Sequence, residues 1–196
     1  MKPTPDVIAQ GRIDTPLGPL ALWATERGLA AVLFDAQKHH PGAADAPTLM
    51  SHPHIALAAR ELGEYFAGTR REFTVPIDPQ GTPFQREVWQ ALRAIACGQL
   101  SSYGDIARQV GRPAAMRAVG AAVGRNPLTI VVPCHRVVGS DGSLTGFAAG
   151  LPRKRALLAL EGSLTGELSA DPVSGTWLAA PCAVRSADCP DRRPGP

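Results

Sequence analysis

The chain has 196 residues, a mass of 20.6 kDa and a formal net charge of +3. Its hydrophobic content of 44% and charged content of 19% are typical of globular proteins, which excludes wholesale disorder. No apolar run approaches the ~18 residues of a membrane span, the first ten residues lack a signal-peptide core, and four scattered cysteines are too few for a disulfide framework. We therefore expect a cytoplasmic protein with reduced thiols.

Residues 1–80 are predicted to form a small α/β domain. Three short apolar segments, separated by turn signals rich in glycine and proline, predict strands at residues 9–13, 20–23 and 30–34. Apolar residues at helical spacing then predict a helix over residues 55–67. A small antiparallel sheet with one helix packed against it is the expected arrangement.

Residues 81–162 are predicted to form a second, mostly helical domain. Capping signals and apolar periodicity predict helices over residues 83–97, 102–110 and 114–125. The second and third of these are separated by only three residues, Gly111-Arg112-Pro113, which is the helix-turn-helix arrangement.

The remainder of the chain contains two further predicted elements and a tail. An apolar run predicts a buried strand over residues 128–132, and a short helix is expected over residues 152–160. The cluster Arg153-Lys154-Arg155 at the start of this helix is expected to be either solvated or in contact with phosphate. Residues 163–196 are rich in proline with little periodicity, and we expect a mostly disordered tail there.

The positive charge is concentrated in one part of the chain. Residues 84–162 have a net charge of +6, whereas the segments before and after them have −2 and −1. The predicted helix over residues 114–125 lies in this block and consists almost entirely of small residues. Its glycines weaken a helix, so we expect it to approach another surface closely. Tight helix packing would explain this composition, but the basic surroundings favour nucleic acid.

Cys134 is the strongest candidate for a nucleophile. A free thiol, with a pKa of ~8.5, is mostly protonated at neutral pH and needs a base. His135 is adjacent, and Glu161, one of four acidic residues in the basic block, is the leading candidate to orient the imidazole. Because neighbouring side chains of a strand point to opposite faces, direct contact between Cys134 and His135 requires a backbone turn or a bridging water. A buried structural cysteine is the alternative.

Several motifs together resemble one known family, the methylated-DNA–protein-cysteine methyltransferases, which repair 6-O-alkylguanine. The stretch PCHRV at residues 133–137 carries this resemblance, together with RAVG at 117–120 and Asn126-Pro127. It extends to residues 82–89, 102–107, 139–146 and 157–162, and more loosely to residues 15–20 and 64–68. The resemblance implies an α+β fold, with a ribonuclease-H-like N-terminal domain and a winged-helix-like C-terminal domain that contains the helix-turn-helix.

The resemblance also implies the roles of the reacting residues. Cys134 would attack the alkyl carbon of the lesion and keep the alkyl group as a thioether, so each molecule would react once. His135 would accept the thiol proton through a water and would itself be held by Glu161. Asn126 would brace the turn between the recognition helix and the active site.

Contacts with DNA follow from the same resemblance. The damaged nucleotide must leave the duplex, because its reactive atom is buried in the base stack. Arg117 would fill the resulting gap, and Tyr103 would help to rotate the nucleotide. The small residues around Gly120 would let the helix enter the minor groove. Gln85 and Arg125 would contact phosphates.

The implied base pocket consists of Tyr103, the backbone carbonyl near Val137 and the backbone amides of Phe147 and Ala148. The expected partner is double-stranded DNA carrying alkylated guanine, without a cofactor, a metal, a membrane or an obligate protein partner. We expect a monomer, with cooperative binding on DNA left open. Two alternatives are a non-enzymatic lesion-binding protein, which Cys134 argues against, and a helix-turn-helix regulator, for which no effector domain is visible.

Overall fold

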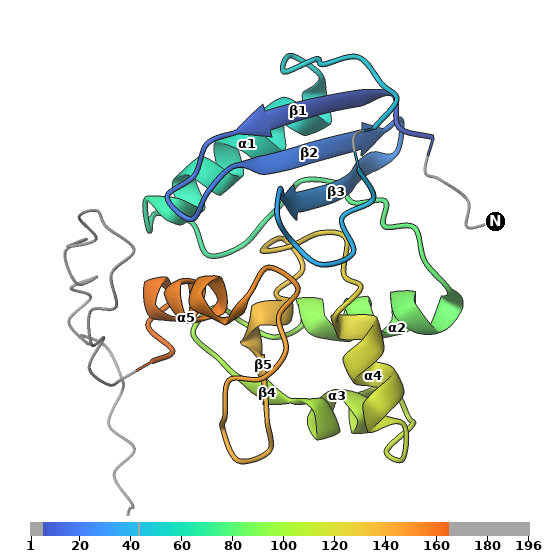
Figure 1. Ribbon diagram of the computed structural model, residues 1–196, viewed down its shortest axis with the longest axis vertical. Helices are drawn as coiled ribbons and strands as arrows, with labels where there is room; N and C mark the ends of the chain where they lie inside the picture. Colours follow the sequence, from blue (N-terminus) through green and yellow to red (C-terminus); the bar gives the residue numbers. More distant parts are fainter. Residues whose placement is uncertain (1–5, 43, 165–196) are drawn as a thin grey trace, which may run out of the picture. The chain divides into compact units, whose positions relative to one another are not determined.

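The N-terminal half of the chain is a three-stranded sheet covered by one helix. The computed structural model describes residues 6–42 and 44–164 (Figure 1), so almost all of the predicted tail lies outside the described residues. Strands β1 (Ala9–Ile13), β2 (Leu20–Thr25) and β3 (Gly28–Phe34) pair antiparallel in that order, and α1 (Pro53–Phe66) packs against them. The predicted α+β class and small antiparallel sheet are confirmed.

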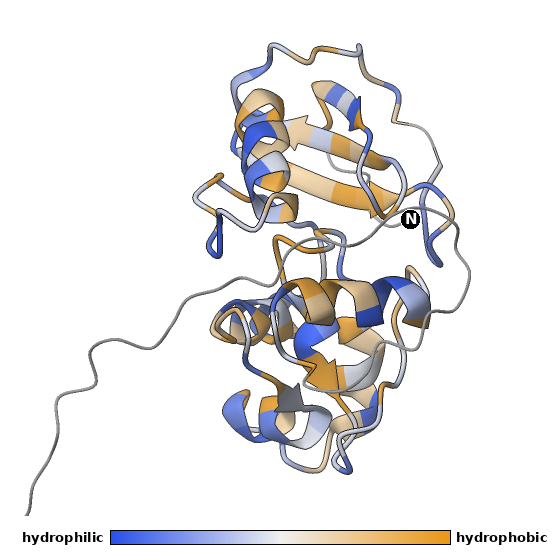
Figure 2. Cartoon of the chain, turned by 90° about the vertical axis from the view of Figure 1, so that its left-hand side faces the viewer, coloured by the Kyte–Doolittle hydropathy of each residue, from blue (hydrophilic) through white to orange (hydrophobic). Residues whose placement is uncertain are grey.

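Both faces of this sheet are covered by apolar side chains. All seven residues of β3 are buried, and the strands are predominantly hydrophobic (Figure 2). On one face, Ile55 and Leu62 of α1 join the main core. On the other, Trp23 and Leu33 form a smaller cluster. The sheet is therefore packed on both faces, as expected for the close-packed interior of a folded domain.

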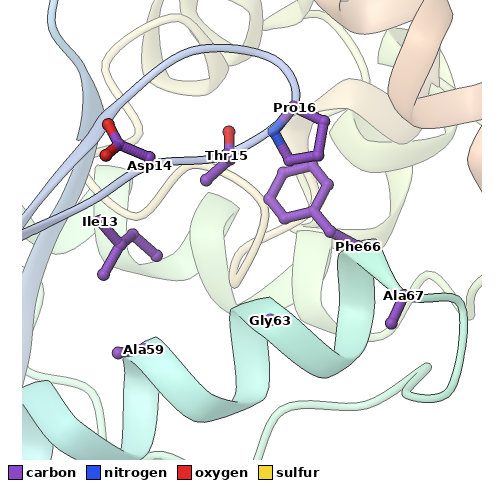
Figure 3. A pocket seen from close by; sticks show the side chains of 8 residues that line it. All are labelled: Ile13, Asp14, Thr15, Pro16, Ala59, Gly63, Phe66 and Ala67. Carbon is purple, nitrogen blue, oxygen red and sulfur yellow. The ribbon is translucent and has the colours of Figure 1, made fainter. Parts of the chain in front are cut away.

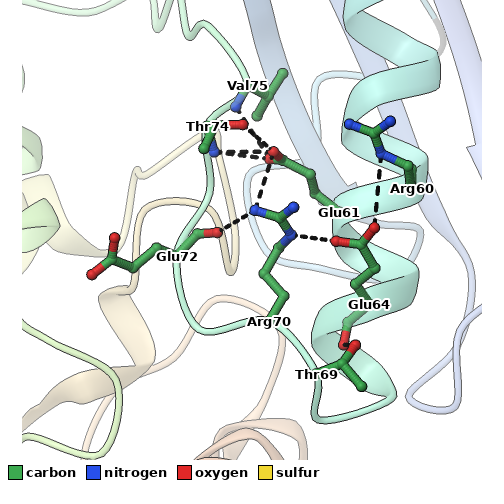
Figure 4. A network of polar contacts seen from close by, with 8 residues as sticks. All are labelled: Arg60, Glu61, Glu64, Thr69, Arg70, Glu72, Thr74 and Val75. Carbon is green, nitrogen blue, oxygen red and sulfur yellow. Dashed lines mark hydrogen bonds and ion pairs between the residues drawn. The ribbon is translucent and has the colours of Figure 1, made fainter.

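Glu61, on α1, connects the helix to the segment that follows it (Figure 4). Its carboxylate is fully buried and accepts hydrogen bonds from the backbone amides of Thr74 and Val75 and from the Thr74 hydroxyl. Arg70 lies 3.4 Å from the same carboxylate. Because a buried charge is costly unless it is paired and hydrogen-bonded, these partners fix the orientation of α1.

The C-terminal half is mostly helical. Its elements are α2 (Pro83–Arg93), β4 (Ser101–Ser102), α3 (Tyr103–Gln109), α4 (Met116–Val123), the 3-10 turn η1 (Cys134–Arg136), β5 (Val137–Val138) and α5 (Leu151–Leu160). The helices α2, α3 and α4 pack against one another, and β4 pairs parallel with β5. Capping boxes at Thr82 and Ser102 begin α2 and α3, as the sequence predicts for α3.

The predicted strand over residues 128–132 is wrong. The segment forms a tight turn in which the Val132 amide donates to the Leu128 carbonyl, and Ile130 adopts a left-handed φ of 74°. Isolated bridges pair Leu128 with Val32 and Thr129 with Val132. The apolar run predicted burial correctly, but a buried apolar run does not by itself determine an extended backbone.

Two predicted helices are shorter than expected. The helix α2 ends at Arg93, because the amides of Ala94 and Ile95 bond to carbonyls three residues back in a tighter turn. The helix α4 begins at Met116, since the Ala115 amide closes a separate turn onto Arg112 and no side chain caps the helix. The connection between α3 and α4 therefore spans residues 110–115 rather than three residues.

Candidate active site

Cys134 lies at the start of η1, where the chain turns sharply before β5. Its side chain is buried, and its Sγ accepts a hydrogen bond from Asn126 Nδ2 at 3.1 Å. A backbone turn, one of the two alternatives that the sequence leaves open for contact between Cys134 and His135, is therefore present at this point. Burial raises the pKa of the Cys134 thiol, whereas the Asn126 hydrogen bond and the charge of Lys154 act to lower it.

Asn126 holds the irregular segment that leads to the cysteine. Its Nδ2 donates to the Val132 carbonyl at 2.8 Å, and its Oδ1 accepts from the Leu128 amide at 3.0 Å. One buried side chain therefore bonds to both ends of the turn around Ile130 as well as to Cys134 Sγ. Side-chain amides can make several bonds of this kind, because they combine two donors with an acceptor.

His135 and Glu161 form a buried pair beside the cysteine. His135 Nε2 lies 2.8 Å from Glu161 Oε1, and both residues are excluded from solvent. Because Nε2 faces a carboxylate, it carries the ring proton and leaves Nδ1 as an acceptor. His135 Nδ1 is buried and has no hydrogen-bond partner among the described residues. Burial lowers the pKa of His135, and the nearby Glu161 opposes this shift.

Two residues that sequence reasoning did not assign to the site also bind the Glu161 carboxylate. Arg136 donates from Nε and one terminal nitrogen at 2.8 and 2.9 Å, and the Tyr65 hydroxyl donates at 2.8 Å. Burial opposes ionisation of Glu161, but the hydrogen bonds from His135 and Arg136 lower its pKa to about 2. Both residues lie within motifs that carry the family resemblance, and this was their only sequence signal.

Lys154 corrects a second interpretation. The cluster Arg153-Lys154-Arg155 was expected to be a solvated helix start or a phosphate contact, but Lys154 is fully buried. Its Nζ donates to the carbonyls of Val137 at 2.5 Å and Thr145 at 2.7 Å. Burial lowers its pKa to about 8. Lys154 lies seven residues before Glu161, the C-cap residue of α5, a spacing that places both on one side of the helix.

Arg153 is not a solvated side chain either. Its guanidinium lies 4.6 Å from the centre of the Phe34 ring and donates to the backbone carbonyls of Leu17 and Ala149. Arg155 is the exposed member of the cluster. Two of the three cations therefore bind the protein itself.

Tyr103 lies beside the cysteine at the start of α3. Its hydroxyl is 3.4 Å from the carbonyls of Thr145 and Gly146, and burial raises its pKa. A methyl group at Gly120 on α4 would lie 3.9 Å from the Tyr103 ring, so the two helices meet here through small and aromatic surfaces.

The predicted pocket residues lie along the loop and strand near the cysteine. Val137 is fully buried, and its carbonyl already accepts from Lys154 but retains a second lone pair. Phe147 and Ala148 are half-buried. Within the described residues, neither of their amides donates a hydrogen bond, so both are available to a ligand.

The predicted DNA contacts lie outside this cluster. Arg117 on α4 and Arg125 just beyond it are exposed. Gln85 is half-buried, and its Oε1 accepts from the Thr82 amide in the capping box of α2, which leaves its Nε2 for other partners. The structure thus pairs Cys134 with Asn126 and His135 with Glu161. The side chains of Gln85, Arg117 and Arg125 lie on α2, on α4 and just after α4.

Two hollows in the surface involve none of these residues. One, of about 350 Å³, lies between the β1–β2 turn and α1 (Figure 3) and is lined mainly by apolar side chains such as Ile13 and Phe66. The other, of about 400 Å³, is bordered by Arg27, Arg86 and Arg93. In residues 6–42 and 44–164, no helix is long and apolar enough to cross a membrane, and no cluster of metal-ligating side chains is found.

A buried cysteine beside a neutral histidine and an ionised glutamate, on a fold with a helix-turn-helix, defines the class of cysteine-nucleophile enzymes with a nucleic-acid-binding element. The family models of 6-O-methylguanine DNA methyltransferase match both halves, the ribonuclease-like domain over residues 8–79 and the DNA binding domain over residues 83–163. The chain belongs to the methylated-DNA–protein-cysteine methyltransferase family.

Individual relatives agree with this assignment. The methyltransferases of Methanosarcina acetivorans and Salmonella typhimurium are each 45% identical, with 76% and 80% of this chain and 96% and 97% of the relatives covered. The crystal structure of Mycobacterium tuberculosis OGT in complex with DNA has a TM-score of 0.74 and 44% identity, covering 80% of this chain and 94% of that one. The Mycobacterium tuberculosis O6-methylguanine methyltransferase has a TM-score of 0.72 and 45% identity, covering 79% and 93%.

Proposed function

We propose that this protein repairs DNA by direct reversal, transferring a methyl or larger alkyl group from the O6 atom of guanine to Cys134. The observation that carries the proposal is the arrangement at the cysteine: a buried thiol hydrogen-bonded by Asn126, adjacent to a His135–Glu161 pair. Alkylated O4 of thymine is a second substrate of the same chemistry.

The reaction is an in-line displacement at the alkyl carbon. A new bond forms between Cys134 Sγ and that carbon while the carbon–O6 bond breaks, and the bonding electrons remain on the guanine oxygen. The thiol proton passes to His135 Nδ1 through a water, for which this unpartnered buried atom is a suitable acceptor. Glu161 stabilises the resulting imidazolium. The thioether product contains no leaving group for hydrolysis, so each molecule reacts once.

Recognition of the lesion requires the nucleotide to leave the base stack. Arg117, exposed on α4, fills the space in the duplex, and Tyr103 receives the rotated nucleotide at the edge of the pocket. The surface of α4 around Gly120 enters the minor groove, since its small side chains let the backbone approach the sugars. Gln85 Nε2 and Arg125 contact phosphates.

Inside the pocket, backbone groups recognise the guanine. The second lone pair of the Val137 carbonyl accepts from its amino group, and the free amides of Phe147 and Ala148 face the departing oxygen. Lys154 bridges the carbonyls of Val137 and Thr145 and so sets the separation of the strand and the loop. The reaction requires no metal or organic cofactor.

The protein acts as a monomer in the cytoplasm, where thiols remain reduced. We also propose that residues 1–80 and 81–162 are its two domains, which agrees with the limits of the two family matches. The recognition surface lies on the second domain, and the first domain contributes Tyr65, which donates a hydrogen bond to Glu161.

Incubation with a duplex carrying 6-O-methylguanine tests the proposal. Mass spectrometry should find one added methyl group per molecule, on the peptide that contains Cys134, and unmodified guanine in the DNA. Cys134→Ala should retain binding to the duplex without any transfer. Binding of the lesion by the unaltered protein with no modified cysteine would instead show a non-enzymatic lesion-binding protein. Preference for one DNA sequence irrespective of damage would show a regulator.

A further inference from the structure

Tyr65 connects the N-terminal half of the chain to the reacting groups. It lies near the end of α1, is almost fully buried, and donates a hydrogen bond from its hydroxyl to Glu161 Oε1 at 2.8 Å. We infer that Tyr65 is a positioning residue for alkyl transfer, whose hydroxyl adjusts the basicity of His135 through Glu161. This inference rests on the function proposed above.

The hydrogen bonds at Glu161 show why one hydroxyl matters. Oε1 accepts from His135 Nε2, from a terminal nitrogen of Arg136 and from Tyr65, whereas Oε2 accepts from Arg136 Nε. Tyr65 therefore competes directly with the imidazole for the negative charge on Oε1. Each donor that shares an anionic oxygen reduces the stabilisation available to a neighbouring imidazolium. Tyr65 thus weakens His135 as a base while holding the carboxylate in place.

Tyr65 is a fixed donor that does not ionise in the working pH range. Its ring packs against the rings of Phe66 and Phe73 at centroid separations of 5.4 and 5.6 Å. The buried Glu61, one helical turn earlier on α1, fixes the helix that carries it. Burial raises the pKa of Tyr65 far above its ordinary value, with the negative charge of Glu161 adding to the effect. The hydroxyl therefore remains a neutral donor.

The other groups that face the His135–Glu161 pair come from three further segments. Arg136 on η1 binds the carboxylate and is held by the Ile95 carbonyl. Lys154 on α5 acts on His135 through its charge. Cys97, in the segment after α2, lies close enough to act on Tyr65 and Arg136, and burial raises its pKa. Arg71 acts on Cys97. The substitutions at Tyr65 described below leave all of these groups unchanged.

The test is the pH dependence of single-turnover transfer from methylated duplex by the full chain. Tyr65→Phe removes the hydroxyl and leaves the ring, so we expect the acidic limb of the rate profile to move to higher pH. The pKa of His135, followed by NMR of the imidazole, should rise by the same amount. Phe66→Leu is the matched control: it disturbs packing around the same ring and lowers the Tm, but should leave the profile in place.

A second substitution reverses the expected sign. Site-specific 3-fluorotyrosine at position 65 keeps the hydroxyl but makes it a stronger donor, so the limb and the His135 pKa should move to lower pH. In a Glu161→Gln background, Tyr65→Phe should change neither quantity further, because the anionic acceptor has been removed. If Tyr65→Phe fails to fold, the 3-fluorotyrosine protein alone still tests the role of the Tyr65 hydroxyl.

The possible failures are distinguishable. Profiles of Tyr65→Phe and the fluorinated protein that coincide with the parent, with transfer intact, would overturn the role of Tyr65 and leave the proposed function standing. Absence of transfer in the parent protein would overturn the proposed function. The His135 pKa still measures the coupling in that case, since it requires no reaction.

Discussion

Lys154 Nζ lies 2.5 Å from the backbone carbonyl oxygen of Val137, and Lys154 is fully buried. The same ammonium group reaches the Thr145 carbonyl. A single side chain of α5 therefore holds together the strand that follows the cysteine and the loop at Thr145. In the function proposed above, these two elements must keep their spacing when guanine enters.

Substitution Lys154→Met should slow transfer by about tenfold or more, equivalent to at least ~1.4 kcal/mol in activation free energy. The carbonyls of Val137 and Thr145 lose their donor, and the thiol loses a charge that lowers its pKa. Because the defect lies in the pocket, rates with free benzylguanine and with methylated duplex should fall together. The exposed neighbour provides the control: Arg155→Met should leave the rate with benzylguanine unchanged.

Two replacements of Asn126 should separate its contribution to folding stability from its effect on the Cys134 thiol. Asn126→Ala removes three buried hydrogen bonds and should lower the free energy of unfolding by roughly 2–3 kcal/mol, measured by urea denaturation. Asn126→Asp keeps the acceptor for the Leu128 amide but places a carboxylate beside Sγ. It should raise the thiol pKa and slow alkylation of Cys134 by iodoacetamide at neutral pH, quantified on its peptide. Equal iodoacetamide rates for Asn126→Asp and the parent would contradict this.

The role proposed for Arg117 requires duplex DNA, and its side chain is exposed on α4. Arg117→Ala should slow transfer from methylated duplex by roughly tenfold or more, since base flipping costs a few kcal/mol, while reaction with free benzylguanine remains normal. Arg60→Ala removes the same charge from α1 and should slow neither reaction. Similar slowing with both substrates would mean that Arg117 supports the fold or the pocket instead.

Ionised Glu161 should stabilise the folded state in a pH-dependent manner. Its pKa of about 2 lies below the ordinary value of 4.5, so its contribution is complete above about pH 5 and decreases as the pH falls towards 2. The stability advantage of the parent over Glu161→Gln should therefore be on the order of 3 kcal/mol at pH 7 and should shrink by pH 3. Urea unfolding at four pH values measures it. A constant advantage down to pH 3 would show that Glu161 does not titrate with a lowered pKa.

The sequence predicted what local patterns determine. Three strands and the helix α1 follow from apolar spacing and turn residues. The capping box at the start of α3 follows from the three-residue separation of the Ser102 hydroxyl and the Asp105 carboxylate. Motif resemblance implied a shared site for Cys134, His135, Glu161 and Asn126, and the structure pairs Asn126 with Cys134 and His135 with Glu161. Spacing alone had left a structural cysteine as an alternative.

What the sequence could not predict depends on contacts between distant residues. The turn around Ile130 was mistaken for a strand, because the hydrogen bonds that bend it come from the Asn126 side chain. Tyr65 lies 96 residues from Glu161, so no local pattern connects them. Lys154 was taken for a surface cation, since only the folded protein shows carbonyl acceptors inside the core.

The short parallel pair of β4 and β5 fixes the positions of Tyr103 and Cys134 relative to each other. Ser101 and Ser102 pair with Val137 and Val138, so the residue just before Tyr103 is fixed against the strand just after Cys134. The spacing of tyrosine and thiol is thereby set across the sheet and not along the intervening residues 104–133. A change in the length or packing of the helices and loops between them should therefore leave the separation of the Tyr103 ring and the Cys134 thiol unaltered, as long as the β4–β5 pairing is kept.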